Sequence, residues 1–325
     1  MHPALSVIIF TVASGAGYGL LFLLGVGAAI GMLPPAFGFG VAAFGLSLGL
    51  VVSGLLSSTL HLGHPERAWR ALSQWRSSWL SREGLASFIT FIPTILFAGG
   101  WTILGDNQDG WGLFGLIAAA WATITVYCTA MIYASLTTIQ RWHNGWVAPC
   151  YLLLALMSGA VLLNALVFLF ELPIVGAAHG TLLALMIGWL VKLGYWRHID
   201  RSRADSTAET ATGLGHLGQV RLLDAPHTEE NYLMREMGFR IARKHAYKLR
   251  AIATVLAFVV PSLLLSAVAI LAVPPPGADG TMAAIQAACA TLAALLVFPG
   301  LLIERWLFFA EAKHTVMLYY GARSA

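Results

Sequence analysis

Long apolar stretches alternate with short polar connections along most of the chain. Eight of these stretches are long enough to cross the hydrocarbon core of a membrane, which takes about 20 apolar residues. They cover residues 5–31, 36–60, 84–104, 111–138, 148–170, 174–197, 250–273 and 281–304. Backbone groups find no water to bond in lipid, so we expect each stretch to be a helix. The pattern therefore predicts an all-α, polytopic integral membrane protein with a bundle of eight transmembrane helices.

The composition supports this fold class and excludes a soluble one. Asp, Glu, Lys and Arg make up 10% of the 325 residues, whereas ordinary globular proteins contain roughly 25% of them. Apolar residues make up 58% of the chain. So few charges cannot cover the surface of a soluble protein, and they also argue against a disordered chain or a nucleic-acid partner.

The positions of the positive charges predict the orientation in the membrane. When the connections are numbered alternately, all 19 Lys and Arg residues fall on the side that holds the two termini. Positive residues mark cytoplasmic loops, so we expect both termini in the cytoplasm and the protein in the bacterial inner membrane. This interpretation places Lys192, Arg250 and Arg305 in cytoplasmic connections or the tail, and it leaves no Lys or Arg inside the spans.

One long connection divides the chain into three parts. Residues 1–197 hold the first six spans, including the loop 61–83; residues 198–249 form a cytoplasmic insertion; and residues 250–325 hold the last two spans and the tail. The second half of the insertion is basic and helical in pattern. It fits either a surface helix attracted to anionic lipid or a clamp on a partner protein.

The loop between the second and third spans carries the most reactive side chains. His61 closes the second span and Glu83 opens the third, so we expect both at the cytoplasmic rim of the bilayer, on adjacent helices. Ionisable groups at that depth are costly and mark functional sites by default. The alternative is an ordinary interfacial loop, in which Trp belongs to the aromatic belt and Arg follows the positive-inside bias.

A quinone would suit such a rim. Its ring carbonyls need hydrogen-bond donors, and its two-electron reduction takes up two protons. Histidine can donate the bond and pass the proton near neutral pH, and a carboxylate one helix away can relay protons to or from the cytoplasm. The residue types alone leave both interpretations open, a quinone site and a structural loop.

Two short motifs in this loop carry a resemblance to a known family. The segment HLG-x-P-x-RA, from His61 to Ala68, and the segment LS-x-E, from Leu80 to Glu83, resemble the membrane anchor subunit of DMSO-reductase-type complexes. The end of the last span is similar too, with Glu304-Arg305, Phe308-Phe309 and His314 before Thr315. The long insertion resembles more closely the anchors of the cytoplasmic sulfite-oxidising branch, and with eight spans the resemblance covers nearly the whole chain.

The resemblance implies an anchor for two soluble subunits. One would carry molybdenum bound to two pterin guanine dinucleotides, and the other would carry four-iron, four-sulfur clusters. The anchor itself would bind ubiquinone or menaquinone and would hold no metal, no haem and no catalytic centre. The family's quinone-site residues carry over as His61 and Glu83, to which Arg67 and His64 are added. We expect the partners to dock on Arg70, Arg76, Arg82, Arg235, Arg240 and Arg243.

The expected function is to pass electrons between the iron–sulfur subunit and the quinone pool, with sulfite as their source. One alternative is a DMSO or S-oxide reductase anchor that oxidises menaquinol, and another is a purely structural anchor. A transporter or proton-translocating subunit is the rival class; it would have inverted repeats and charges at the membrane midplane, and we expect neither. His179, in the sixth span, is expected to be a hydrogen-bonded interior residue rather than a haem ligand.

Overall fold

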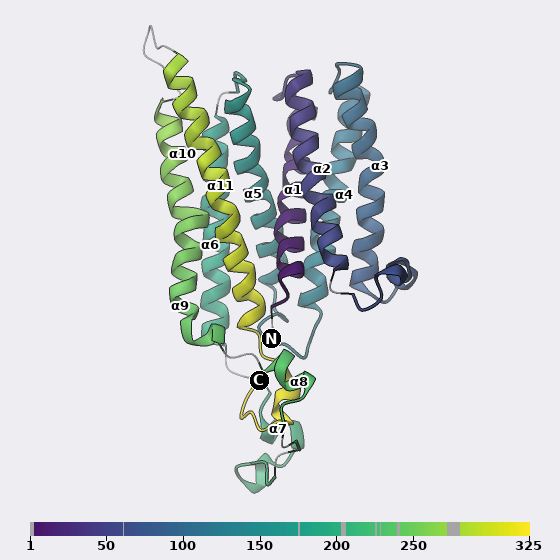
Figure 1. Cartoon of the computed structure of the whole chain (residues 1–325), viewed down its shortest axis with the longest axis vertical. Helices are drawn as coiled ribbons and strands as arrows, with labels where there is room; N and C mark the ends of the chain where they lie inside the picture. Colours follow the sequence, from purple (N-terminus) through teal and green to yellow (C-terminus); the bar gives the residue numbers. More distant parts are fainter. Residues whose placement is uncertain are drawn as a thin grey trace.

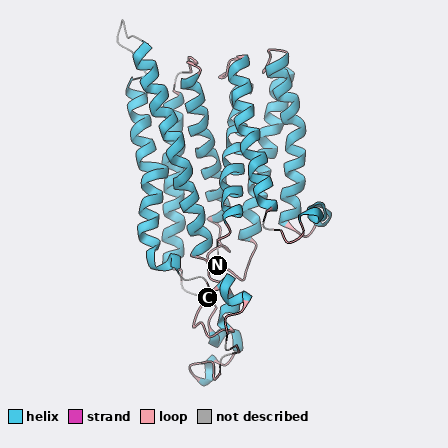
Figure 2. Cartoon of the chain, viewed as in Figure 1, coloured by secondary structure: helices cyan, strands magenta, loops and turns pink. Residues whose placement is uncertain are grey.

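The computed structural model of the chain describes residues 3–60, 62–174, 176–202, 206–224, 226–227, 229–238, 241–271 and 280–325. Within these ranges, eight helices are long and apolar enough to cross a membrane, and they lie side by side (Figure 1). Helices and loops account for the elements that the structure describes (Figure 2). The predicted all-α fold with eight spans is therefore confirmed.

The first six spans are single helices, and the seventh is composite. The first six are α1 (Leu5–Ala29), α2 (Phe37–Thr59), α3 (Trp79–Ile103), α4 (Asp109–Ala134), α5 (Val147–Leu169) and α6 (Ala177–Arg201). The seventh span runs through α9 (Ile241–Thr254), a wider turn η3 (Val255–Val259) and α10 (Val260–Leu271), and the eighth is α11 (Gly280–Ala310). Two helices extend further than the apolar stretches alone indicate, α6 to Arg201 and α11 to Ala310.

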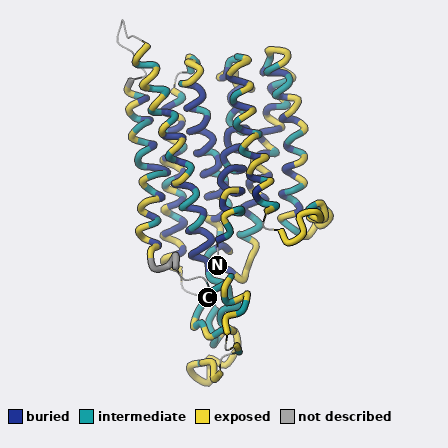
Figure 3. Tube along the Cα trace, in the orientation of Figure 1, coloured by how far each residue is buried: buried dark blue, intermediate teal, exposed yellow. Residues whose placement is uncertain are grey.

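α1 lies in the middle of the bundle. In its most apolar window 72% of the residues are buried, compared with 28% for α6 (Figure 3). Small residues permit this position: a Cβ at Gly19 would overlap the carbonyl group of Ala155 on α5, and one at Gly159 would overlap the backbone of Gly19. Close backbone approach of this kind replaces the hydrophobic driving force that helices lack in lipid.

Both ends of the chain lie at the same end of the bundle, which we call the terminal end (Figure 1). Beyond it, part of the insertion packs on the C-terminal tail as a small terminal cap, made of α7 (Ala208–Thr212), α8 (Tyr232–Met237), η4 (Thr315–Leu318) and their loops. Thr207 forms a backbone bridge with Ser324, and Asn231 Nδ2 donates to Tyr320 Oη at 3.0 Å. The insertion is thus tied to the tail.

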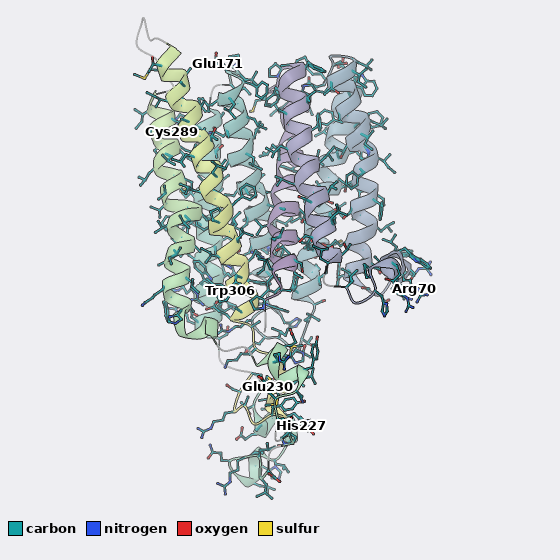
Figure 4. The ribbon with its side chains drawn as sticks, in the orientation of Figure 1. Arg70, Glu171, His227, Glu230, Cys289 and Trp306 are labelled. Carbon is teal, nitrogen blue, oxygen red and sulfur yellow. The ribbon has the colours of Figure 1, made fainter. Side chains whose placement is uncertain are left out.

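The loop after α2 contains a short helix, η1 (Pro65–Gln74), that packs on the start of α3. Ser81 donates its hydroxyl to the carbonyl of Ala71, and the side chain of Leu72 lies against Gly84. Arg70 on η1 and His227 and Glu230 of the terminal cap all lie at the terminal end, whereas Glu171 lies at the opposite end (Figure 4).

Candidate functional site

Glu83, in the second turn of α3, faces the interior of the bundle. Its residue is 4% exposed, and its carboxylate accepts a hydrogen bond from the hydroxyl of Thr129 on α4. The Thr129 hydroxyl also lies 3.1 Å from the carbonyl oxygen of Thr125. Among the described residues, no Lys, Arg or His forms an ion pair with Glu83. A buried carboxyl without a neighbouring cation is uncommon and marks a candidate site for proton chemistry.

The other predicted quinone-site residues lie elsewhere or cannot be placed. His64 Nδ1 is 3.0 Å from Glu66 Oε1, Arg67 Nε is 3.6 Å from the same oxygen, and all three side chains are more than half exposed. His61 lies outside the described residues. The structure therefore places Glu83 in the interior and does not bring His64 or Arg67 to it. The grouping of these four residues around a quinone stays a prediction.

The junction between η1 and α3 is held by one of the arginines predicted to dock a partner. Arg82 donates to the carbonyl oxygens of Trp75 and Arg76 at 2.9 and 2.8 Å, and its guanidinium lies 4.2 Å from the ring centre of Trp79. This arginine therefore has a structural role that fixes η1 beside Glu83. Arg70 and Arg76, in contrast, are exposed on η1 and just after it.

The predicted docking arginines of the insertion are only partly described. Arg235 is exposed on α8 in the terminal cap, at the same end of the molecule as η1. Arg240 lies outside the described residues. Arg243 belongs to α9, but its side chain also lies outside what the structure describes. The partner surface therefore stays a prediction, with Arg70, Arg76 and Arg235 as its exposed members.

A cluster of three charged side chains, Lys192, Glu304 and Arg305, lies buried between α6 and α11. The carboxylate of Glu304 pairs with the ammonium of Lys192, and its second oxygen is 2.6 Å from Arg305 Nε. All three residues are at most 4% exposed. The cations also rest on aromatic rings: Lys192 Nζ is 4.2 Å from the ring centre of Tyr195, and the Arg305 guanidinium is 4.2 Å from that of Tyr151. We call this group the ionic cluster.

The ionic cluster corrects the prediction that no Lys or Arg lies inside the spans. Lys192 was expected in a polar connection and Arg305 in the tail, but the extended α6 and α11 carry both of them into the bundle. The physical reason is pairing, because Glu304 neutralises part of their charge and the aromatic rings cover the rest. A sequence signal exists, since Lys192 stands between apolar neighbours on both sides.

Arg250 is also buried rather than a surface residue of the insertion. Its guanidinium donates to Asp200 Oδ2 at 2.6 Å and to Glu311 Oε1 at 2.9 Å. These three residues join the end of α6, the seventh span and the segment after α11. Arg250 therefore fastens the terminal end of the bundle, and the seventh span begins earlier, near His245, than its apolar stretch indicates.

His179 is exposed near the start of α6, and not in the interior as predicted. Helical periodicity does not distinguish a face that meets lipid or solvent from one that meets other helices, which explains the error. Within the described residues, no group of three or more His, Cys, Asp or Glu side chains is arranged to hold a metal ion.

Within the described residues, eight membrane-length helices surround buried ionisable side chains, and a polar cap lies at one end. These features define a multi-pass membrane protein with charged groups inside its bundle. The family described as DMSO reductase anchor subunit (DmsC) matches residues 1–321. The chain belongs to this family, and the resemblance of its motifs is confirmed.

Two relatives give the family match further content. The chain is 33% identical to a sulfite dehydrogenase subunit of Allochromatium vinosum over 339 aligned positions, which cover 98% of this chain and 99% of that protein. It is 32% identical to the anaerobic dimethyl sulfoxide reductase chain YnfH of Escherichia coli over 116 positions, or 35% of this chain and 39% of that protein. The similarity to the sulfite dehydrogenase protein therefore extends over the full length, and the similarity to the reductase chain over about a third.

Proposed function

We propose that the chain is the quinone-reactive membrane anchor of a molybdenum and iron–sulfur oxidoreductase complex, and that it delivers electrons from sulfite to quinone. Family membership supports the role of anchor, and full-length similarity to a sulfite dehydrogenase subunit supports sulfite as the electron source. The observation that carries the quinone site is Glu83, a buried carboxyl at the end of the LS-x-E motif that has no cationic partner among the described residues.

In this proposal the protein positions the quinone and moves protons, while the redox chemistry belongs to the quinone itself. Reduction takes two electrons from the iron–sulfur partner and two protons from the protein side. Glu83 holds a proton in the interior and gives it to a ring oxygen; His61, which follows the end of α2, hydrogen-bonds the ring and supplies or relays the second proton. Glu83 and His61 thus serve as proton donors, with Arg67 and His64 at the entrance of the site.

The soluble partners would dock at the terminal end. Arg70 and Arg76 in the η1 loop and Arg235 on α8 present exposed positive charge. Arg70 and α8 both lie at the terminal end (Figures 1 and 4), and α3, which carries Glu83, begins directly after the η1 loop. Positive charge of this kind marks the cytoplasmic side, which would place the iron–sulfur and molybdenum subunits inside the cell. An iron–sulfur cluster of a partner docked there would lie at the end of the bundle where α3, the helix of Glu83, begins.

The partial similarity to a dimethyl sulfoxide reductase chain supports a second candidate, an anchor that oxidises menaquinol for an S-oxide reductase. The same carboxyl would then accept protons rather than donate them. The two candidates differ in the substrate of the purified complex: sulfite-dependent quinone reduction supports the first, and quinol-dependent S-oxide reduction supports the second.

The test separates quinone turnover from upstream electron transfer. The complex is purified with Glu83→Gln or His61→Ala, and sulfite oxidation is measured once with a quinone and once with a soluble artificial acceptor that bypasses the anchor. We expect each variant to lose at least about 100-fold in quinone reduction, the size of a lost general acid, with the artificial acceptor reduced normally. Glu171→Gln, at an exposed carboxylate on the opposite end of the bundle, is the matched control. Normal quinone reduction by Glu83→Gln would refute the site.

A further inference from the structure

A small cavity lies in the core of the bundle between Glu83 and the ionic cluster. Thr129, which bonds Glu83, lines one side of it, and Arg305 and Tyr151 line the other, with Ser14 and Ser158 among the remaining lining residues. The cavity offers about 30 Å³ to the centre of a water molecule. One ordered water needs about 10–15 Å³ of such space, so the cavity has room for about two. It is far too small for a quinone ring.

Two buried polar groups on the lining residues have no hydrogen bond of good geometry among the described residues, although the two side chains that carry them interact with each other. They are Nη1 of Arg305 and the hydroxyl of Tyr151. Nε and Nη2 of Arg305 both donate to Glu304, and Nη1 is not used in this pairing. Buried donors are almost always satisfied, by protein or by ordered water. Most of the cavity wall is apolar, but these two donors and the Thr129 hydroxyl give it the polar partners that a buried water needs.

The Thr129 hydroxyl has fewer hydrogens than the number of acceptors around it. The Thr129 hydroxyl has a single hydrogen, but it faces two acceptors, a carboxylate oxygen of Glu83 and the carbonyl oxygen of Thr125. A proton on Glu83 would satisfy both, because Glu83 could then donate to Thr129 while Thr129 donates to Thr125. The arrangement therefore accommodates two states, with and without a proton on Glu83, that differ only in the direction of one hydrogen bond.

The ionic cluster places a net charge near the cavity. With both cations and Glu304 ionised, the cluster carries one excess positive charge in the interior. Tyr151, which borders the cavity, lies within electrostatic range of Glu83, Glu304 and Arg305. This positive charge lies on the side of the cavity that Arg305 lines.

We propose that the cavity holds ordered water, anchored by Arg305 and Tyr151, through which Glu83 regains protons. The inference rests on the proposed function, in which Glu83 gives a proton to quinone. A proton taken up from solvent passes through the water to the Thr129 oxygen as Thr129 passes its own proton to the Glu83 carboxylate. The products are a neutral water and a protonated Glu83. Arg305 and Tyr151 are positioning residues that act through the water, and Thr129 is the relay.

The experiment uses the whole complex and two substitutions that remove one hydroxyl each, Thr129→Val and Tyr151→Phe. Thr94→Val is the matched control, a fully buried threonine on α3 whose hydroxyl bonds only the carbonyl of Thr90 at 2.7 Å. Activity with the artificial acceptor confirms that each complex assembles. We expect both variants to lose at least about tenfold in quinone reduction and to show a larger solvent isotope effect. The control variant should reduce quinone at the wild-type rate.

A spectroscopic readout separates the water path from a structural role. Infrared difference spectra between oxidised and reduced complex should contain a carboxylic acid band that Glu83→Gln removes, and a water band that moves in ¹⁸O-labelled water. We expect Thr129→Val and Tyr151→Phe to shift the first band and abolish the second. If both variants retain wild-type rates and no band responds to labelled water, while Glu83→Gln is inactive, the water path is refuted and the quinone site stands. If Glu83→Gln itself remains active, the proposed function fails.

Discussion

Two buried carboxylates in the same bundle have opposite surroundings. Glu304 is fully buried and lies between two cations, Lys192 and Arg305. Glu83 is 4% exposed and has a threonine hydroxyl as its hydrogen-bond donor. The cost of removing an ionised carboxylate from water is recovered only by close opposite charge, so Glu304 has a reason to stay ionised and Glu83 does not. In our proposal Glu304 therefore has a structural role, and Glu83 exchanges protons.

The largest expected effect is on stability when the paired carboxylate is removed. Glu304→Gln would leave Lys192 and Arg305 buried without a counter-charge, and breaking a buried pair in this way costs about 3–5 kcal/mol. The free energy of unfolding, measured by detergent-induced unfolding in mixed micelles, should fall by that amount. A change of less than about 1 kcal/mol would show that the ionic cluster does not hold α6 to α11.

Removing one cation of the cluster should cost less. Lys192→Met keeps a long unbranched side chain and leaves Glu304 paired with Arg305. Only one charge-assisted contact is lost, which is worth about 1.5–3 kcal/mol. The same unfolding experiment measures it. A loss as large as that of Glu304→Gln would mean that the two cations do not share the carboxylate, contrary to the geometry.

The unpaired carboxylate should behave differently in the same experiment. Glu83→Gln removes no ion pair among the described residues, and an amide oxygen can still accept the hydrogen bond from Thr129. We expect the free energy of unfolding to change by less than about 1 kcal/mol. Together with the expected loss of quinone reduction, this result would separate function from stability. A large destabilisation would instead place Glu83 among the structural charges.

The smallest expected effect lies outside the membrane, in the terminal cap, where a titratable group is tied to backbone structure. His314 Nδ1 accepts a hydrogen bond from the backbone nitrogen of Val316 at 3.0 Å, and burial lowers the pKa of His314 below its usual value. A lowered histidine pKa favours the neutral form in the folded cap. The stability that His314 contributes is therefore present above its pKa in the unfolded chain, and it is lost as pH falls through its lower pKa in the folded cap. The protonated ring would also lose its acceptor at Nδ1.

Hydrogen exchange of the peptide that contains η4 tests this difference. Protection, corrected for intrinsic exchange rates, should be lower at about pH 5.5 than at about pH 7.5, on either side of the ordinary histidine pKa of about 6.5. His314→Asn keeps a side-chain acceptor that does not titrate and should remove the pH dependence. An unchanged pH dependence in that variant would mean that another group controls the cap.

The sequence was sufficient for the bundle but not for its interior charges. Eight apolar stretches predicted eight helices, because hydrophobic length translates directly into membrane spans. Counting Lys and Arg by side assigned Lys192 and Arg305 to connections, because the rule treats a cation near the end of a span as exposed. Their burial depends on a partner, Glu304, that the packing of α6 and α11 against α5 and α10 brings to Lys192.

The candidate site shows the same division. Glu83 could be singled out because it opens an apolar helix next to a recognisable motif, and the structure places it in the interior. Thr129 and Tyr151 could not, since they come from α4 and α5 and carry no motif; their importance follows from the cavity they share. The adjacent pair Glu304 and Arg305 would not be expected to bond, because neighbouring residues on a helix point in different directions.

The most direct test of the central claim is a structure of the assembled complex with a quinone or a tight-binding quinone analogue. Our account predicts the ring at the terminal end, with an oxygen within hydrogen-bond distance of the Glu83 carboxyl and His61 at its other side. A ring bound at the opposite end of the bundle, or bound away from Glu83, would contradict it.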